Sequence, residues 1–242
     1  MSKARETSSD RRAELRERRD RERRQVARRR NLTVSAAVVA AFAVVAAAFV
    51  VFAGRGEDTA GPAAGESRYV RADSHKLSTA ADGKVTLVEF LDFECEACRA
   101  FYPIVEELRT TYNGKVTFVA RYFPLPGHFN AERAARAVEA SAQQGRFEAM
   151  YTKMYETQSQ WGEQRVPADD VFRGFAKDLG LNMTAWEKSY NAPATLNRVN
   201  KDVADGRALD VQGTPTFFLN GKKVQPQSID DFKKAIDAAL DS

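Results

Sequence analysis

The two cysteines of this chain, Cys95 and Cys98, are separated by only two residues in the segment FECEACR. Such a pair can supply half of a metal site, a small structural disulfide or a redox-active dithiol. A zinc site needs about four ligands, and the two histidines, His75 and His128, lack zinc-finger spacing. A structural disulfide across so short a loop constrains little unfolded-chain entropy. We therefore expect thiol–disulfide chemistry, with no metal and no organic cofactor.

The pair lies where a strand is expected to end and a helix to begin. The segment KVTLVEFLDF, residues 84–93, is rich in Val, Leu and Phe and predicts a buried parallel strand. The following CEACRAFYPIVEELRTTYNG has one apolar helical face and ends at Asn113-Gly114. The free amides of a first helical turn stabilise negative charge, so Cys95 is expected to ionise more readily than an ordinary thiol. Cys98 follows one turn later, within reach of a disulfide to Cys95.

The remaining elements predict an α/β domain over residues 74–242. KVTFVARYF, residues 115–123, is expected to be a second strand and completes a βαβ unit. Residues from about 130 to 208 are helical in pattern. TPTFFLNGKKV predicts a hairpin that turns at Asn220-Gly221, and SIDDFKKAIDAALDS predicts a capped amphipathic helix. The two outer pieces, βαβ and ββα, are expected to share one sheet, with the helical block as an insertion.

The first 73 residues differ sharply in composition from the rest. Residues 1–30 carry 13 Lys or Arg and 6 Asp or Glu, whereas residues 31–53 carry no charge and are mostly apolar. As a helix, residues 31–53 would span about 34 Å, against a hydrocarbon core of about 30 Å. We expect a basic cytoplasmic tail, one transmembrane helix and a flexible linker over residues 54–73, with a cleaved signal peptide as the alternative. Because the basic charge belongs to the tail, no nucleic-acid partner is expected for the domain.

The segments VEFLDFECEAC and GTPTFFLNG, together with Pro103, resemble the thioredoxin fold. The long helical block between the two halves makes the chain similar to the DsbA-type oxidoreductases. This resemblance implies that Cys95 is the nucleophile and that Cys98 is the resolving cysteine.

The resemblance also implies roles for three residues outside the cysteine motif. Glu89 matches the buried acid under the disulfide, and Thr214-Pro215 matches the loop that carries a cis-proline opposite the cysteines. A carboxylate in an apolar strand has a raised pKa, so Glu89 is expected to exchange protons with Cys98. The alternative is an ion pair between Glu89 and a lysine such as Lys84 or Lys115. If Pro215 is cis, the backbone of Thr214 is placed to pair with an extended substrate segment.

Three residues around Cys95 are expected to tune its redox strength. The motif carries Glu96-Ala97 between the cysteines, where many family members have proline and often histidine, and Glu94 precedes Cys95. Two nearby negative charges oppose thiolate formation, which predicts a milder oxidant than relatives with a histidine. His128 is distant from Cys95 in sequence, so a structural or helix N-terminal role is expected for it.

These features predict a membrane-anchored thiol–disulfide oxidoreductase of the cell envelope. Its partners would be cysteine-containing translocated proteins and a membrane redox partner that re-oxidises it. The alternatives are a reductase or isomerase on the same fold, or a peptide-binding, chaperone-like receptor in which the disulfide is incidental. The expected location is a single-pass cell-membrane protein with a cytoplasmic N-terminus and an extracytoplasmic C-terminal domain.

The expected topology is testable through the cysteines themselves. A membrane-impermeant thiol label should reach Cys95 in intact, reduced cells, because the charge asymmetry around residues 31–53 directs the domain outward. Gel analysis of the labelled protein before and after lysis gives the accessible fraction. Labelling that occurs only after lysis would contradict this topology.

Overall fold

Residues 67–242 are described by the structure, a computed structural model of the chain. The expected tail, the expected transmembrane helix and residues 54–66 of the expected linker lie outside this range. Among the described residues, no helix combines the length and the apolar character needed to cross a membrane.

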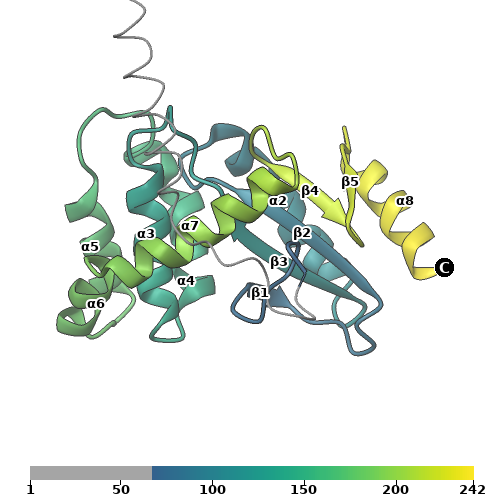
Figure 1. The fold of residues 1–242 in the computed structure, drawn as a ribbon, viewed down its shortest axis with the longest axis horizontal. Helices are drawn as coiled ribbons and strands as arrows, with labels where there is room; N and C mark the ends of the chain where they lie inside the picture. Colours follow the sequence, from purple (N-terminus) through teal and green to yellow (C-terminus); the bar gives the residue numbers. More distant parts are fainter. Residues whose placement is uncertain (1–66) are drawn as a thin grey trace, which may run out of the picture. The chain divides into compact units, whose positions relative to one another are not determined.

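A five-stranded mixed sheet forms the centre of the domain (Figure 1). Its strands lie in the order β1 (His75–Ser78), β3 (Val116–Tyr122), β2 (Val85–Leu91), β4 (Thr216–Leu219) and β5 (Lys222–Val224). β2 and β3 are parallel, and the other three neighbouring pairs are antiparallel. The two outer pieces of the sequence therefore share one sheet, as expected, whereas the edge strand β1 was not predicted.

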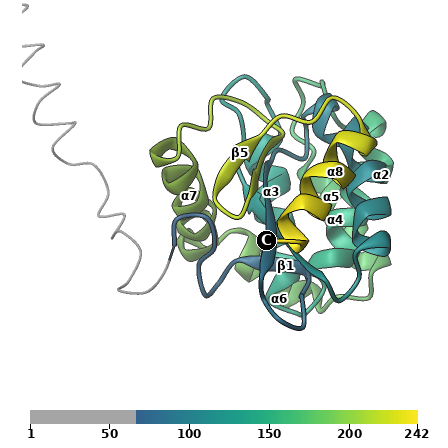
Figure 2. The same cartoon turned by 90° about the vertical axis from the view of Figure 1, so that its right-hand side faces the viewer.

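Helices cover both faces of the sheet. Their bounds are α2 (Glu96–Thr111), α3 (Ala131–Ala142), α4 (Phe147–Thr157), the short 3₁₀ helix η1 (Gln158–Gln160), α5 (Asp169–Asp178), α6 (Met183–Tyr190), α7 (Pro193–Ala208) and α8 (Ile229–Leu240). α7 lies on one side of the sheet, and α2 and α8 lie on the other (Figure 2). The elements from α3 to α7 form the helical insertion expected between β3 and β4.

The alternation of side chains along β2 divides the interior into two cores. Leu87 and Leu91 belong to the larger core, which contains both cysteines and residues of α2, α3, α4 and α8. Val88 and Phe90 belong to the smaller core, which packs against α7. Because successive residues of a strand face opposite sides, Glu89 faces the larger core together with the cysteines.

A buried arginine joins β3 to α7. Arg121 is fully buried, and its guanidinium donates to Asp202 at 2.7 Å and to Asp205 at 2.6 Å. Arg198 on α7 also donates to Asp202, at 2.7 Å. A charge inside a protein needs such partners, so this cluster fixes the insertion against the sheet.

Arg121 also binds the chain segment before β1, which was expected to belong to the flexible linker. Arg121 donates to the backbone carbonyls of Arg68, at 2.9 Å, and Tyr69, at 2.8 Å. The ring of Tyr69 packs edge-on against Phe218 at 5.2 Å, and Arg71 donates to Asp205. Residues 68–73 are thus part of the folded domain, because the buried guanidinium needs acceptors beyond those that α7 supplies. The linker boundary expected at residue 73 is too late in the chain.

Replacing Arg121 by Met should destabilise the domain by about 3–5 kcal/mol, because two buried aspartates would each lose one of their two cationic partners. Urea unfolding followed by circular dichroism measures this loss. Arg173→Met is the control, since Arg173 makes only surface pairs with Asp170 and Glu187 and should cost less than about 1 kcal/mol. If both variants lose the same free energy of unfolding, the buried cluster stabilises the domain no more than a surface ion pair does.

Candidate functional site

The cysteines lie at the junction between β2 and α2, as the sequence predicts. Cys95 is the N-cap residue of α2, with an extended backbone, and Cys98 lies in the first turn. Both thiols are free. Cys95 retains 7% of its surface, whereas Cys98 retains none. An external sulfur therefore has access to Cys95 alone.

The surroundings of Cys95 favour its thiolate. A hydrogen bond from the Cys98 thiol is the largest influence and lowers the pKa of Cys95 to about 5, although burial acts in the opposite direction. Thr214 and the backbone amides of Cys98 and Ala97 lower it further. These amides are the free donors of the first helical turn. Cys95 is therefore largely ionised at neutral pH.

The pKa values of Cys98 and Glu89 are raised, in contrast to the lowered pKa of Cys95. Burial raises the pKa of Cys98 well above its usual value, and the neighbouring Cys95 and Glu89 raise it further. Burial likewise raises the pKa of Glu89 to about 8, with smaller contributions from the charges of Cys95 and Glu106. A carboxyl with this pKa beside a buried thiol is suited to accept and return its proton.

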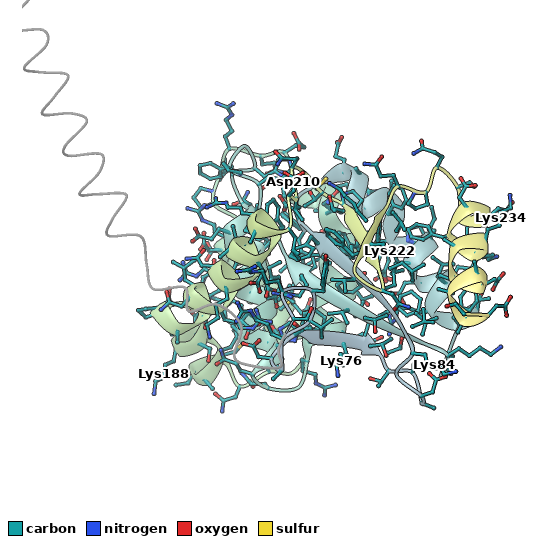
Figure 3. The ribbon with its side chains drawn as sticks, turned by 45° about the vertical axis from the view of Figure 1, so that its right-hand side comes forward. Lys76, Lys84, Lys188, Asp210, Lys222 and Lys234 are labelled. Carbon is teal, nitrogen blue, oxygen red and sulfur yellow. The ribbon has the colours of Figure 1, made fainter. Side chains whose placement is uncertain are left out.

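The expected alternative, an ion pair of Glu89 with a lysine, does not fit the geometry. Lys84 is exposed at the outside of the domain (Figure 3), and Lys115 is exposed as well. The charges that act on the Glu89 carboxyl come from an acid and a thiol, not from a lysine.

The peptide bond between Thr214 and Pro215 is cis. Its loop lies against the reactive sulfur, since the Cys95 sulfur is 3.3 Å from the Thr214 carbonyl oxygen, to which it donates when it is protonated. β4 begins directly after the proline. A shallow pocket beside the loop is lined by Phe101, Pro215, Thr216, Phe217, Lys223, Val224, Gln225, Pro226 and Gln227. The loop thus brings a backbone carbonyl to Cys95 and borders a hollow that is lined by both apolar and polar side chains.

A histidine–aspartate pair near Cys95 was missed by the sequence reasoning. The Nδ1 atom of His128 lies 2.6 Å from Asp92 Oδ2, and this hydrogen bond is the main reason that the pKa of His128 rises to about 9. The charge of Cys95 raises it further. His128 is therefore a cation at neutral pH in the neighbourhood of the reactive sulfur, in addition to any structural role.

A signal for this pair is present in the sequence. Asp92 directly follows β2, and His128 follows the adjacent parallel strand β3. The carboxyl ends of parallel strands meet at one edge of a sheet, where functional residues gather. The distance between His128 and Cys95 along the chain hides this neighbourhood.

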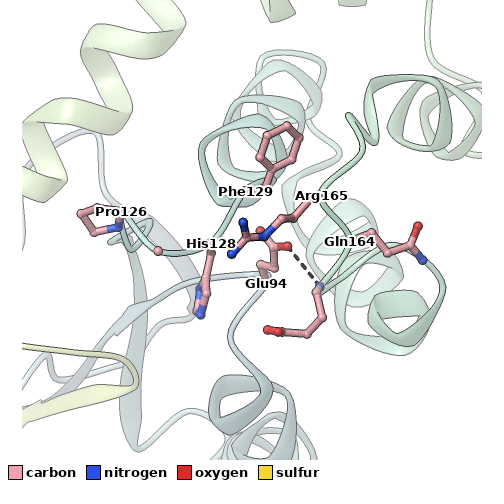
Figure 4. A pocket seen from close by; sticks show the side chains of 8 residues that line it. Glu94, Pro126, His128, Phe129, Gln164 and Arg165 are labelled. Atoms are coloured by element: carbon pink, nitrogen blue, oxygen red, sulfur yellow. Dashed lines mark hydrogen bonds between the residues drawn. The ribbon is translucent and has the colours of Figure 1, made fainter.

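Glu94 lies in a pocket that also contains His128 (Figure 4). Its buried carboxylate accepts hydrogen bonds from the backbone amides of Asn130, at 2.6 Å, and Glu163, at 3.1 Å. The tuning role expected for Glu94 stays a prediction; its charge is bound by the start of α3 and by the loop after η1. Glu96 and Ala97 are exposed, and Ala97 acts on Cys95 through its amide.

The helical insertion also holds the motif directly. The side-chain amide of Gln158 in η1 donates to the carbonyls of Phe93, at 2.7 Å, and Cys95, at 2.9 Å. Within residues 67–242, no group of three or more His, Cys, Asp or Glu side chains is arranged to hold a metal ion.

Comparison with known proteins identifies the same domain. The family model described as thioredoxin matches residues 79–238. Among curated proteins, the Na(+)/H(+) antiporter NhaA 1 of Mycobacterium sp. (strain KMS) is 32% identical over 167 residues, which is 67% of this chain and 25% of that protein. The corresponding protein of Salinispora arenicola is 36% identical over 143 residues, 59% of this chain and 21% of that protein. The chain thus spans about a quarter of the length of these relatives.

Solved structures share the fold at lower sequence identity. A thioredoxin-like oxidoreductase from Silicibacter pomeroyi has a TM-score of 0.60 and 23% identity, over 77% of this chain and 99% of that one. BdbD from Bacillus subtilis has a TM-score of 0.62 and 23% identity, over 68% and 92% of the chains. Alpha-DsbA1 from Wolbachia pipientis has a TM-score of 0.64 and 16% identity, over 71% and 93%.

Replacing His128 by Gln should raise the pKa of Cys95 by about one unit, because a single nearby charge contributes on the order of 1 kcal/mol. Thiolate absorbance against pH, in reduced protein, measures the change. His75→Gln is the control, since His75 is paired with Glu139 and stacked on Phe147. If the pKa of Cys95 is the same in His128→Gln and in the native protein, the charge of His128 does not act on the Cys95 thiolate.

Proposed function

The chain belongs to the thioredoxin family, and because its fold also matches DsbA-type structures, we propose that it is a thiol–disulfide oxidoreductase that forms or exchanges disulfides in other proteins. The observation that carries the proposal is the contrast between two thiols in one helical turn. Cys95 is acidic and reachable, whereas Cys98 is buried and held as a thiol.

The reaction begins from the Cys95–Cys98 disulfide. A substrate thiolate attacks the Cys95 sulfur, the bond between the two cysteines breaks, and Cys98 leaves with the electron pair and takes a proton from Glu89. A second substrate thiolate then attacks the substrate sulfur of the mixed disulfide and releases Cys95 as a thiolate. The substrate gains a disulfide and loses two electrons, and the cysteine pair becomes a dithiol.

The acidity of Cys95 supports the oxidising direction. A stabilised thiolate stabilises the reduced form, which makes the disulfide a stronger oxidant. The corresponding pKa is about 7 in thioredoxin and about 3.5 in DsbA, and the lowered pKa of Cys95, about 5, lies between these two values. This favours disulfide formation over the alternative of a reductase, and it favours a stronger oxidant than the two motif glutamates suggest.

The cis-proline loop is the proposed substrate site. An extended peptide can pair with the Thr214 backbone, in the manner of strand addition, and place its cysteine sulfur against Cys95. The neighbouring pocket, where Phe101, Phe217 and Val224 lie beside Lys223, Gln225 and Gln227, offers a mixed apolar and polar surface to an adjacent side chain.

The cellular setting is proposed from residues 1–53. Their charge and hydropathy pattern supports a single membrane anchor with the domain outside, where disulfides persist. Translocated proteins would be the substrates, and a membrane redox partner would restore the disulfide. Ion transport, which the names of the curated relatives indicate for those proteins, is not proposed here, because the similarity covers about a quarter of their length.

The assigned roles predict an asymmetry in trapped complexes. Cys98→Ser should accumulate mixed disulfides with cysteine-containing proteins, because Cys98 no longer displaces the substrate from Cys95, whereas Cys95→Ser should accumulate far fewer. Non-reducing gels of cells that express each variant provide the measurement, with the double serine variant as the blank. Equal trapping by the two single variants would contradict the roles of Cys95 as the attacked sulfur and Cys98 as the resolving cysteine. Absence of trapping in both would favour the peptide-binding receptor.

A further inference from the structure

The turn from Gln158 to Glu163 binds the backbone that leads into Cys95. Gln158 in η1 retains 2% of its surface, and its Nε2 atom donates to the carbonyls of Phe93, at 2.7 Å, and Cys95, at 2.9 Å. At the other end of the turn, the Glu163 amide donates to the Glu94 carboxylate at 3.1 Å. Three consecutive residues at the start of α2 are therefore held by a segment that lies 63 to 69 positions later in the chain.

Close packing within this turn fixes the place of Gln158. The Gln158 carbonyl accepts from the backbone amides of Trp161, at 3.1 Å, and Gly162, at 2.7 Å. A Cβ atom at Gly162 would lie 3.0 Å from that carbonyl oxygen and 3.2 Å from the Gln158 Cγ atom, so a side chain there would push Gln158 away by a few tenths of an ångström. Glu163 has a φ of 59°, in the left-handed region that residues with side chains rarely adopt. The turn thus keeps local strain and a close contact at the place where its donors meet the cysteine motif.

The dithiol form of the cysteine pair needs this positioning more than the disulfide form does. In the disulfide form a covalent bond to Cys98 fixes the Cys95 sulfur, which then carries no charge. In the dithiol form, which the structure describes, the free amides at the start of α2 stabilise a thiolate on Cys95 while the Cys95 backbone keeps its extended conformation. The carbonyl that Gln158 holds belongs to that backbone. A donor that fixes it therefore favours the dithiol form.

We propose that Gln158 is a positioning residue that sets the redox potential of the cysteine pair through its hydrogen bonds to the Phe93 and Cys95 carbonyls. This role presupposes the thiol–disulfide exchange proposed above and gives the helical insertion a part in it. Because Gln158 favours the dithiol form, it makes the disulfide a stronger oxidant. Gln158 acts through the backbone of the motif and not by contact with the substrate.

The redox potential can be measured by equilibrium with glutathione. One glutathione disulfide oxidises the dithiol of Cys95 and Cys98: the cysteine pair gains an S–S bond, two electrons and two protons pass to the glutathione disulfide, and two glutathione thiols are released. Loss of a contact that favours the dithiol shifts this equilibrium toward the protein disulfide. The substitution Gln158→Met keeps the approximate length of the side chain and removes both of its donated hydrogen bonds.

Gln158→Met should raise the equilibrium constant for oxidation by glutathione disulfide about tenfold, which corresponds to a potential about 30 mV more reducing. It should also raise the pKa of Cys95, because the thiolate is less well placed before the helix amides. Alkylation of the free thiols after equilibration at several glutathione ratios, followed by mass analysis, gives the equilibrium constant. Thiolate absorbance of the reduced protein against pH gives the pKa.

Asn130→Leu is the matched control. Asn130 is fully buried in the insertion, and its side-chain nitrogen also donates to two backbone carbonyls, those of Gln164, at 3.2 Å, and Val166, at 3.0 Å. These carbonyls belong to the loop before α5 and not to the cysteine motif. The backbone amide of Asn130, which binds Glu94, is kept in this variant. The control should lose stability and keep the native equilibrium with glutathione.

Urea unfolding of the oxidised and the reduced protein separates positioning from a merely structural role. Oxidation and unfolding form a thermodynamic cycle, so a variant that shifts the potential loses more free energy of unfolding in one redox form than in the other. Gln158→Met should destabilise the reduced form more than the oxidised form. Asn130→Leu should destabilise both forms equally.

Gly162→Ala displaces Gln158 without removing its amide, so it tests the same role even if Gln158→Met does not fold. It should shift the equilibrium in the same direction as Gln158→Met, by a smaller factor, because the added Cβ atom presses on Gln158. Gly174→Ala in α5 is the control for this variant, since a Cβ atom at Gly174 meets no other atom within 4 Å. This second control should keep the native equilibrium.

The contrary outcomes distinguish the role of Gln158 from the proposed function. If Gln158→Met and Gly162→Ala keep the native equilibrium with glutathione, or if Asn130→Leu shifts it equally, Gln158 does not set the redox potential. If the native protein forms no disulfide between Cys95 and Cys98 in the presence of glutathione disulfide, the proposed exchange itself is wrong.

Discussion

The difference in burial between two sulfurs three residues apart is the constraint on which the rest of this site depends. At the N-cap of α2, Cys95 meets free backbone amides and the loop of Thr214. Cys98, one turn later, faces the interior and has no contact with solvent. The same helical turn therefore produces one thiolate and one thiol. The hydrogen bond between them increases the contrast, since it stabilises the charge on Cys95 at the expense of Cys98.

The helical insertion supports this arrangement in addition to covering the sheet. Gln158 holds the carbonyls on either side of Glu94, and the start of α3 binds the Glu94 carboxylate. The insertion is itself fixed to the sheet through Arg121 and the aspartates of α7. The contacts that position the cysteine motif thus depend on a buried ionic cluster on the opposite face of the sheet.

Sequence reasoning located the elements that local patterns encode. The strand of residues 84–93, the helix that starts at the cysteines and the turn at Asn220-Gly221 each follow from residues near one another in the chain. The missed features depend on long-range contacts. β1 is four residues long and is defined by its pairing with β3, and residues 68–73 are ordered by a guanidinium some 50 positions later. His128 and Asp92 meet because two parallel strands are neighbours.

Three buried carboxyl groups, Asp92, Glu94 and Glu89, precede the motif, and each is compensated in a different way, so they do not prevent the low pKa of Cys95. Asp92 accepts from His128 and from the backbone amides of Glu94 and Leu125. Glu94 is held by two amides, and burial keeps Glu89 protonated up to about pH 8. Between about pH 5 and about pH 8, Cys95 is therefore a thiolate while Glu89 holds a proton and His128 is positive. Below that window Cys95 is no longer released from the substrate as a stable thiolate, and above it Glu89 has no proton to give to the departing Cys98. The window is therefore set by burial at Glu89 and, at Cys95, by the Cys98 hydrogen bond together with the helix amides.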